Sequence, residues 1–410
     1  MAATTRLRRS SESTAPMSVV PLYLGLNRTE NALIRDVRRY AREIVPSFNV
    51  YVYFRIGYYV ARRVLQFLYR VRLGYADDQA LARIDPNASI VFLMNHRSNV
   101  DYIIVAYMAA NRAALSYAVG EWARTWPLQS LIKSLGGFFV RRNSDNPLYR
   151  RVLARYVQMA TAGGVVQAFY PEGRFTRDGR LGKPRLGLIN YMVSAFDPEG
   201  ERDLVFIPVG INYDRVLEDR SLIRELDPQA SPRSRMYTVV TFLEFLAHNV
   251  KLLLERRWYR FGYACVNFGT PVSMRSYTNR SQIDFRFLGS EDRFAAMERL
   301  GGELLSAIAT TIPVLPVPLI ATVFLRHPRT AMSELEIKAH AHALINDFEQ
   351  HGAYVHIPRS DQDYAAAVGL RMLVLRHLVQ ESDGLYRACD AEHDMLRYYA
   401  NSIAHFLPES

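Results

Sequence analysis

Short apolar runs, separated by longer stretches with helical spacing, organise this chain of 410 residues. The runs are rich in β-branched and aromatic side chains, which is typical of buried strands. They cover residues 88–94, 137–140, 165–170, 204–213 and 262–271. Helical spacing dominates between and after them, for example at 147–162. Alternation of this kind predicts an α/β core with helical additions.

The segment 31–72 has helical spacing, with a break expected near Pro46. In its second half Arg55, Arg62 and Arg70 fall within roughly 80° of one another on a helical wheel. Phe, Tyr and Leu side chains occupy the other faces. A basic stripe opposite such side chains is typical of an interfacial membrane helix. The alternatives are a solvated face of an ordinary core helix and a nucleic-acid contact.

The C-terminal part is expected to be all-helical over residues 330–408, with Ser333 and Ser360 as caps. Before it, the apolar stretch 312–325 is broken by three prolines and predicts a buried or interfacial linker. The resulting domain prediction has four parts: a flexible basic arm (1–30), an amphipathic membrane-contact region (31–80), an α/β domain (81–328) and a helical C-terminal region (329–410).

Charge and composition narrow the class of protein. The net charge is +11, and residues 1–75 hold thirteen arginines against four acidic residues. No nucleic-acid-binding module or zinc spacing accompanies this charge, so we expect no nucleic-acid partner. The two cysteines, Cys265 and Cys389, predict no disulfide framework. We also expect no signal peptide and no spanning helix, because no apolar h-region or long uncharged apolar run is visible.

One histidine and one aspartate lie where the first apolar run ends. His96 follows this run, and Asp101 lies in the first turn of the helix expected next, with Ser98 or Asn99 as its N-cap. Reactive groups commonly lie at strand ends in α/β sheets. A carboxylate on one imidazole nitrogen fixes the tautomer and leaves the other nitrogen as a base. The pair predicts a general base for a hydroxyl, although two such residues also occur by chance.

Arginines and glycines follow the next two apolar runs. Arg141 and Arg142 end the run 137–140, and a guanidinium fork is suited to phosphate. After the run 165–170 comes a glycine-rich loop that holds Glu172 and five cations: Arg174, Arg177, Arg180, Lys183 and Arg185. Such a loop can surround a small dianion, but its spacing is not that of a P-loop. Arginines at a surface strand end are also common without a ligand.

Four blocks in this order resemble the glycerolipid acyltransferase superfamily. They are His96-x-x-x-x-Asp101, Gly137 to Arg142, Phe169 to Arg174, and Phe206 to Val209. The closest resemblance is to the glycerol-3-phosphate acyltransferases, which the later Val-Asn-Phe-Gly-x-Pro stretch ending at Pro271 supports. The likeness extends from about residue 35 to about residue 345. Pro171 and Phe175 depart from the small or polar residues that are more typical of the third block.

The resemblance implies a mixed sheet flanked by helices and a set of site residues. His96 would take the proton of the acceptor hydroxyl, with its tautomer held by Asp101. Pro208 would shape the acyl-donor face. The other substrate-binding residues implied are Arg141, Arg142, Glu172, Gly173, Arg174 and Lys183.

The implied reaction is transfer of a fatty acyl group from a thioester to the sn-1 hydroxyl of glycerol 3-phosphate, which gives lysophosphatidic acid at the start of phospholipid synthesis. The donor is a coenzyme A or acyl-carrier-protein thioester, and neither a cofactor nor a metal is expected. Lysophosphatidate or dihydroxyacetone phosphate are alternative acceptors, and a non-catalytic lipid-binding membrane protein is an alternative of another class. We expect a peripheral, monotopic location at the cytoplasmic face of the cell membrane, on an anionic surface.

Overall fold

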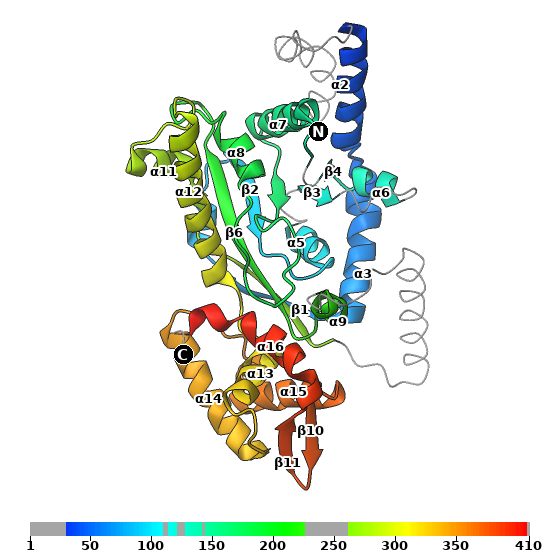
Figure 1. Cartoon of the computed structure of the whole chain (residues 1–410), viewed down its shortest axis with the longest axis vertical. Coiled ribbons are helices and arrows are strands. Elements are labelled where there is room, and N and C mark those ends of the chain that lie inside the picture. The colour runs from blue at the N-terminus through cyan, green and yellow to red at the C-terminus, as the bar shows by residue number, and fades with distance from the viewer. Residues whose placement is uncertain (1–29, 110–113, 121–127, 142–143, 226–260, 408–410) are drawn as a thin grey trace.

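The computed structural model describes residues 30–109, 114–120, 128–141, 144–225 and 261–407, and its main sheet lies between two layers of helices (Figure 1). The strands of this sheet are β1 (Arg70–Ala76), β2 (Ser89–Met94), β3 (Ser116–Gly120), β4 (Gly137–Val140), β5 (Gln167–Phe169), β6 (Leu204–Tyr213), β7 (Tyr263–Phe268) and β8 (Val272–Ser273). Their order is β1-β7-β6-β2-β5-β3-β4, with β8 beside β6. Neighbours are parallel except where β6 meets β7 and β8, so the sheet is mixed, as predicted.

Strand β6 runs through the middle of the sheet, and all ten of its residues are buried. A continuous apolar run of this kind requires cover on both faces. Pro208 pairs with Leu93 of β2 on one side. On the other side it lies between the residues that pair with β8 and those that pair with β7. Proline is usually confined to the edge or a bulge of a sheet. Here it lies at a gap between two partners, where its missing N–H interrupts no ladder.

The two faces of the sheet form separate cores, because alternate residues of a strand point to opposite sides. Phe92 and Met94 of β2 join one core, and Val91 and Leu93 join the other. The helices around the sheet are α2 (Glu30–Ile44), α3 (Tyr58–Leu68), α4 (Asp78–Ala82), α5 (Asp101–Ala109), α6 (Leu128–Ser134), α7 (Pro147–Ala162), α8 (Gly187–Val193), α9 (Asp219–Arg224), α11 (Met274–Ser281) and α12 (Ser290–Thr311). Helices α3 and α5 cover the first face, and α2, α7, α8 and α12 cover the second.

The N-terminal helices agree only in part with the sequence prediction. Helix α2 ends at Ile44, ahead of Pro46, as expected. The next helical segment starts as a π-helix, η2 (Val52–Gly57), and continues as α3. It stops at Leu68, and the chain then enters β1. Arg70 therefore lies on a strand over the ring of Tyr263, so its predicted place on a helical basic stripe is wrong.

The C-terminal part forms a lobe below the sheet (Figure 1). Its helices are α13 (Pro316–Arg326), α14 (Glu334–Gln350), α15 (Gln362–Leu375) and α16 (His393–Asn401). The lobe also contains a small sheet of β9 (Met332–Ser333), β10 (Val379–Ser382) and β11 (Leu385–Ala388), so the all-helical prediction is wrong there. Helix α13 packs on α15 and α16, which moves the start of this lobe ahead of the predicted boundary at residue 328. The stretch expected as a linker is this buried helix, with prolines in its first turn.

One of the two predicted caps is confirmed. Ser333 caps α14 in a capping box with Glu336. Ser360 instead ends a short 3₁₀ turn, and Asp361 caps α15. Within the described ranges, none of the helices combines the length and the apolar character needed to cross a bilayer.

Candidate active site

The turn that joins β2 to α5, residues 95–101, holds the predicted His–Asp pair, and we call it the His96 turn. His96 Nδ1 lies 3.0 Å from Oδ2 of Asp101. The same oxygen accepts the backbone N–H groups of Arg97 at 2.7 Å and Ser98 at 2.9 Å. The carboxylate thus closes the turn and orients the ring. Because Nδ1 is bonded to Asp101, proton transfer at this imidazole falls to Nε2.

Helix α5 begins at Asp101, and neither predicted capping residue caps it in the usual way. The Ser98 hydroxyl accepts the N–H of Val100 before the helix starts. Asn99 uses its side chain elsewhere, as described below.

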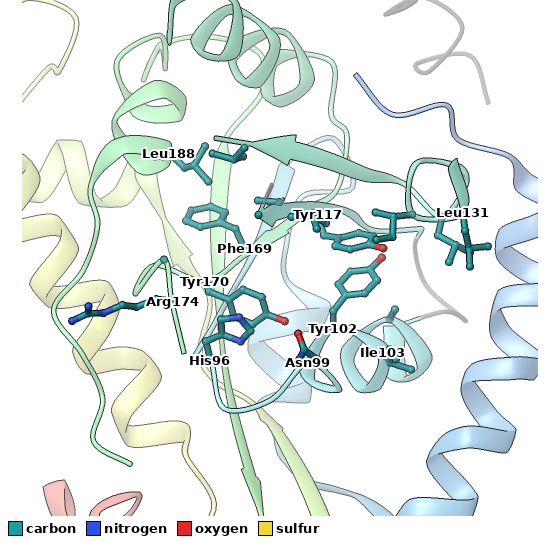
Figure 2. A pocket seen from close by; sticks show the side chains of 18 of the residues that line it. His96, Asn99, Tyr102, Ile103, Tyr117, Leu131, Phe169, Tyr170, Arg174 and Leu188 are labelled. Carbon is teal, nitrogen blue, oxygen red and sulfur yellow. The ribbon is translucent and has the colours of Figure 1, made fainter. Parts of the chain in front are cut away.

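Three aromatic residues fix the pair from outside the turn. Tyr213, at the end of β6, donates from its hydroxyl to the second oxygen of Asp101 at 2.6 Å. Burial raises the pKa of Tyr213 well above its ordinary value, so the phenol remains a donor. The His96 ring stacks on Tyr170, with 3.6 Å between centroids and 8° between planes (Figure 2). The centroid of the Phe175 ring lies 4.0 Å from that of His96. These contacts leave the imidazole little rotational freedom.

Glu172 connects the His96 turn with the basic loop, which we define as residues 173–185. Its Oε1 accepts the N–H of His96 at 2.9 Å, and its Oε2 accepts the N–H of Gly182 at 2.7 Å. Burial raises the pKa of this carboxyl to about 6, and the two backbone donors oppose that effect. Both oxygens are therefore engaged by the backbone.

Glu218, directly before α9, holds the outer side of the His96 turn. Its Oε2 accepts the Ser98 hydroxyl at 2.7 Å. Its Oε1 accepts both the backbone N–H of Asn99 at 3.2 Å and the Asn99 side-chain amide at 2.9 Å. Burial raises the pKa of Glu218.

The basic loop is held by the C-terminal lobe as well. Asn401, the last residue of α16, donates its side-chain amide to the carbonyl of Asp178 at 2.8 Å. The buried guanidinium of Arg97 donates to the Gly179 carbonyl at 2.6 Å and lies 5.0 Å from the ring of Tyr398. Gly179 has a φ of +90°, and a Cβ there would collide with the carbonyl of Tyr398. The backbone of the loop is thus fixed from two sides.

A cavity of about 980 Å³ opens beside His96 and has two kinds of wall. One wall is cationic and comes from Arg174, Arg177 and Arg185 of the basic loop. The other is apolar and aromatic and lies between α3, α5 and the strands β3 and β4. It includes Ile56, Val60, Val64, Tyr102, Ile103, Tyr107, Tyr117, Leu131 and Leu135. His96 and Asn99 line the cavity together with both walls (Figure 2). A base thus lies beside space for an anion and for a long apolar group.

Two family models match the sequence of this chain. The model described as acyltransferase matches residues 77–212, which contain the His96 turn, the basic loop and β6. The model described as glycerol-3-phosphate acyltransferase C-terminal region matches residues 246–409. Over these two ranges the chain is similar to acyltransferases and to the C-terminal region of the glycerol-3-phosphate acyltransferases.

Proteins similar to this chain include ones named glycerol-3-phosphate acyltransferase from three bacteria. The Xylella fastidiosa protein is 27% identical over 74% of this chain and 35% of its own length. The Pseudomonas putida protein is 25% identical over 78% of this chain and 39% of its own length. The Aeromonas hydrophila protein is 25% identical over 89% of this chain and 45% of its own length. The chain therefore spans less than half the length of these relatives.

A solved structure, the 1-acyl-sn-glycerophosphate acyltransferase PlsC from Thermotoga maritima, aligns with 70% of this chain and 92% of its own at 15% identity. The TM-score of 0.32 is too low to carry an argument about this chain.

The structure brings some of the predicted phosphate ligands to the cavity and not others. Arg174 and Gly173 line it, and Figure 2 shows the Arg174 side chain extended away from His96. Arg141 lines it too, but its guanidinium donates twice to Glu43 of α2, at 2.7 Å each, and this pairing raises the pKa of Arg141. Its first task is therefore to tie β4 to α2. Arg142, another predicted phosphate ligand, lies outside the described residues.

The remaining predicted residues lie away from the cavity wall. Lys183 is exposed and does not line the cavity. Glu172 and Pro208 are buried and do not line it either. Pro208 accepts the N–H of Gly269 through its carbonyl, a structural contact within the sheet.

Sequence reasoning missed the groups that hold the pair in place. Tyr213 and Glu218 follow the His96 turn by more than a hundred residues, and no local spacing links them to it. Tyr213 nevertheless ends the fourth predicted strand, β6, and Glu218 lies in the segment between β6 and α9; the pairing of β6 with β2 brings both toward the turn. A prediction that paired β2 with β6 would have indicated that Tyr213 and Glu218 lie near the His96 turn.

Proposed function

We propose that this protein transfers a fatty acyl group from a thioester to the sn-1 hydroxyl of glycerol 3-phosphate. The carrying observation is the placement of the oriented His96–Asp101 pair between a cationic wall and an apolar wall of one cavity. The cationic wall suits the phosphate, and the apolar wall suits the acyl chain. The names of the relatives support the same reaction, and the donor is a coenzyme A or carrier-protein thioester.

The chemistry needs one base and one leaving group. His96 Nε2 removes the proton of the acceptor hydroxyl while the hydroxyl oxygen forms a bond to the carbonyl carbon of the thioester. The C–S bond then breaks, and the imidazolium returns the proton to the departing thiolate. Asp101 stabilises the imidazolium through its hydrogen bond to Nδ1, and Tyr213 holds the Asp101 carboxylate in position. In this proposal the thioester supplies the activation, so no further cofactor takes part.

A thioester-release assay with the purified chain tests the proposal. We expect free thiol to form only when glycerol 3-phosphate is present, and lysophosphatidic acid to form in equal amount. Release driven equally well by water would indicate a hydrolase. Release only with lysophosphatidate or dihydroxyacetone phosphate would change the acceptor, and no release with any of them would favour a lipid-binding protein.

The location we propose is peripheral, at the cytoplasmic face of the membrane. Ile56, Tyr59 and Val60 of η2 and α3 are 48%, 51% and 57% exposed, and Arg55 and Arg62 are exposed beside them. Ile56 and Val60 also line the cavity, so an acyl product would leave across the same surface. Exposed apolar patches with basic neighbours favour an anionic lipid surface.

Sedimentation with vesicles that contain anionic lipid tests this location. Arg55→Glu with Arg62→Glu should weaken binding, and 1 M salt should do the same because the screening length falls to about 3 Å. Arg280→Glu with Arg299→Glu, on α11 and α12, is the matched charge control. Equal losses in both double variants, or binding indifferent to salt, would contradict a specific surface at α3.

A further inference from the structure

Asn99 is the polar side chain that lines the cavity from within the His96 turn without belonging to the His–Asp pair. Its side-chain nitrogen donates to Glu218 Oε1 at 2.9 Å. An ionised carboxylate accepts hydrogen bonds and donates none, so Glu218 selects the orientation in which the amide N–H₂ faces it. The amide oxygen must then point the opposite way. Figure 2 shows this oxygen turned into the cavity, toward His96 and Tyr170.

The position of Asn99 is fixed by more than this one bond. Its backbone N–H also donates to Glu218, and the neighbouring Ser98 hydroxyl bonds to the other Glu218 oxygen. Glu218 in turn lies next to Asp219, which pairs with Arg376 of the C-terminal lobe at 2.6 Å. The Asn99 oxygen is therefore a preorganised acceptor, three residues from the base. Such an acceptor recognises a donor on the substrate.

We propose that Asn99 is a specificity-determining residue that accepts a hydrogen bond from the second hydroxyl of a vicinal diol. The inference rests on the proposed function, in which glycerol 3-phosphate is the acceptor. When the sn-1 hydroxyl lies at His96 Nε2, the sn-2 hydroxyl is one carbon away and can donate to the Asn99 oxygen. Dihydroxyacetone phosphate presents a carbonyl at that position, which would face the amide oxygen with no proton between them. Lysophosphatidate has no second free hydroxyl.

The expected discrimination is moderate. Sites that bury their polar group reject an analogue that lacks the partner by large factors. Asn99 is exposed to the cavity, so water can replace the missing hydroxyl. We therefore expect about a tenfold preference for the diol, which corresponds to about 1.4 kcal/mol.

The test compares glycerol 3-phosphate with 3-hydroxypropyl phosphate, which keeps the phosphate and the reacting hydroxyl but lacks the second one. The wild-type chain should show about a tenfold higher kcat/KM for glycerol 3-phosphate. Asn99→Ala should reduce this ratio to near one. Glu218→Gln keeps Asn99 but removes the charge that orients its amide, so it should shrink the ratio as well. Asn279→Ala, an exposed asparagine on α11, should keep the wild-type ratio.

Each outcome decides between the possibilities. Equal turnover of the two acceptors by the wild type would overturn the role of Asn99 and leave the proposed function intact. An Asn99→Ala loss that is equal for both acceptors would also overturn it, since Asn99 would then act on the reacting hydroxyl or only on the turn. A wild-type chain that acylates neither acceptor would refute the proposed function, and this inference with it.

Discussion

The His96 turn and the basic loop lie side by side, yet their side chains are prepared to different degrees. In the turn, His96 is 9% exposed and Asp101 is fully buried, and hydrogen bonds or ring contacts fix both. In the basic loop the backbone is equally well held, but Arg174 projects outward, and no hydrogen bond or ion pair ties its guanidinium to another described residue (Figure 2). His96 is thus preorganised, whereas the guanidinium of Arg174 can reorient when an anion arrives.

The largest effect should come from removing the base. His96→Ala should lower kcat by about 10²–10⁴-fold, because general-base assistance contributes that much. Asp101→Asn should lower it severely too, since the amide cannot replace the charge that stabilises the imidazolium. Steady-state kinetics and circular dichroism on each variant measure activity and fold. Near-wild-type turnover in a well-folded His96→Ala protein would exclude the mechanism.

The next effect concerns the loop, where one exposed cation lines the cavity and another does not. Arg174→Ala should raise the KM for glycerol 3-phosphate by roughly ten- to a hundredfold, given about 1.5–3 kcal/mol for a hydrogen bond to a charged group. The KM for the thioester should change little. Lys183→Ala is the matched control and should leave both values near wild type. Equal effects from the two substitutions would mean that the loop acts only through its overall charge.

A smaller effect should follow from loosening the support of the turn without touching the pair. Tyr213→Phe removes the donor to Asp101 Oδ1, so kcat should fall about tenfold at an unchanged KM, a change of about 1.4 kcal/mol. Tyr69→Phe is the comparison, because Tyr69 is equally buried and bonds to the Arg215 carbonyl instead. If both variants lost the same activity, packing and not the bond to Asp101 would be the cause.

The remaining effect is on stability and leaves turnover aside; it concerns Glu172, which accepts hydrogen bonds from both regions. Its folded pKa of about 6 exceeds the ordinary 4.5, so the folded state binds this proton more tightly. The contribution to stability is complete below about pH 4.5 and is lost as the pH rises through 6, about 2 kcal/mol in total. Urea unfolding of the wild type and Glu172→Gln at pH 4.5 and 6.5 should show this difference. Parallel pH profiles would contradict it.

The sequence predicts the parts of the fold in which local signals and tertiary structure agree. The buried runs became β2, β4, β5, β6 and β7, and α7 has the predicted bounds. Strand β1 was missed because Arg70–Ala76 mixes basic and apolar residues and continues a helical pattern. Its conformation comes from pairing with β7, nearly two hundred residues later.

Strands β10 and β11 were also not predicted, although the sequence between them contains a local turn signal. The hairpin of β10 and β11 turns at Asp383-Gly384, where both residues have positive φ. An Asp-Gly pair between two strand-like runs is a strong sign of a type I′ turn. In the site, the sequence indicated His96 and Asp101 but not the supporting residues Tyr213 and Glu218. The positions of these two depend on the pairing of strands in the sheet, which no sequence motif specifies.

The contacts between α16 and the basic loop affect the order in which parts of the protein fold during synthesis. Asp178 and Gly179 leave the ribosome more than two hundred residues before their partners Asn401 and Tyr398. Since chains emerge at about 5–20 residues per second, the loop waits at least about ten seconds for these contacts. A nascent chain can thus pair β2 with β6 and form the His96 turn before the basic loop makes its contacts with α16. Synthesis of α16 would then complete the support of the basic loop.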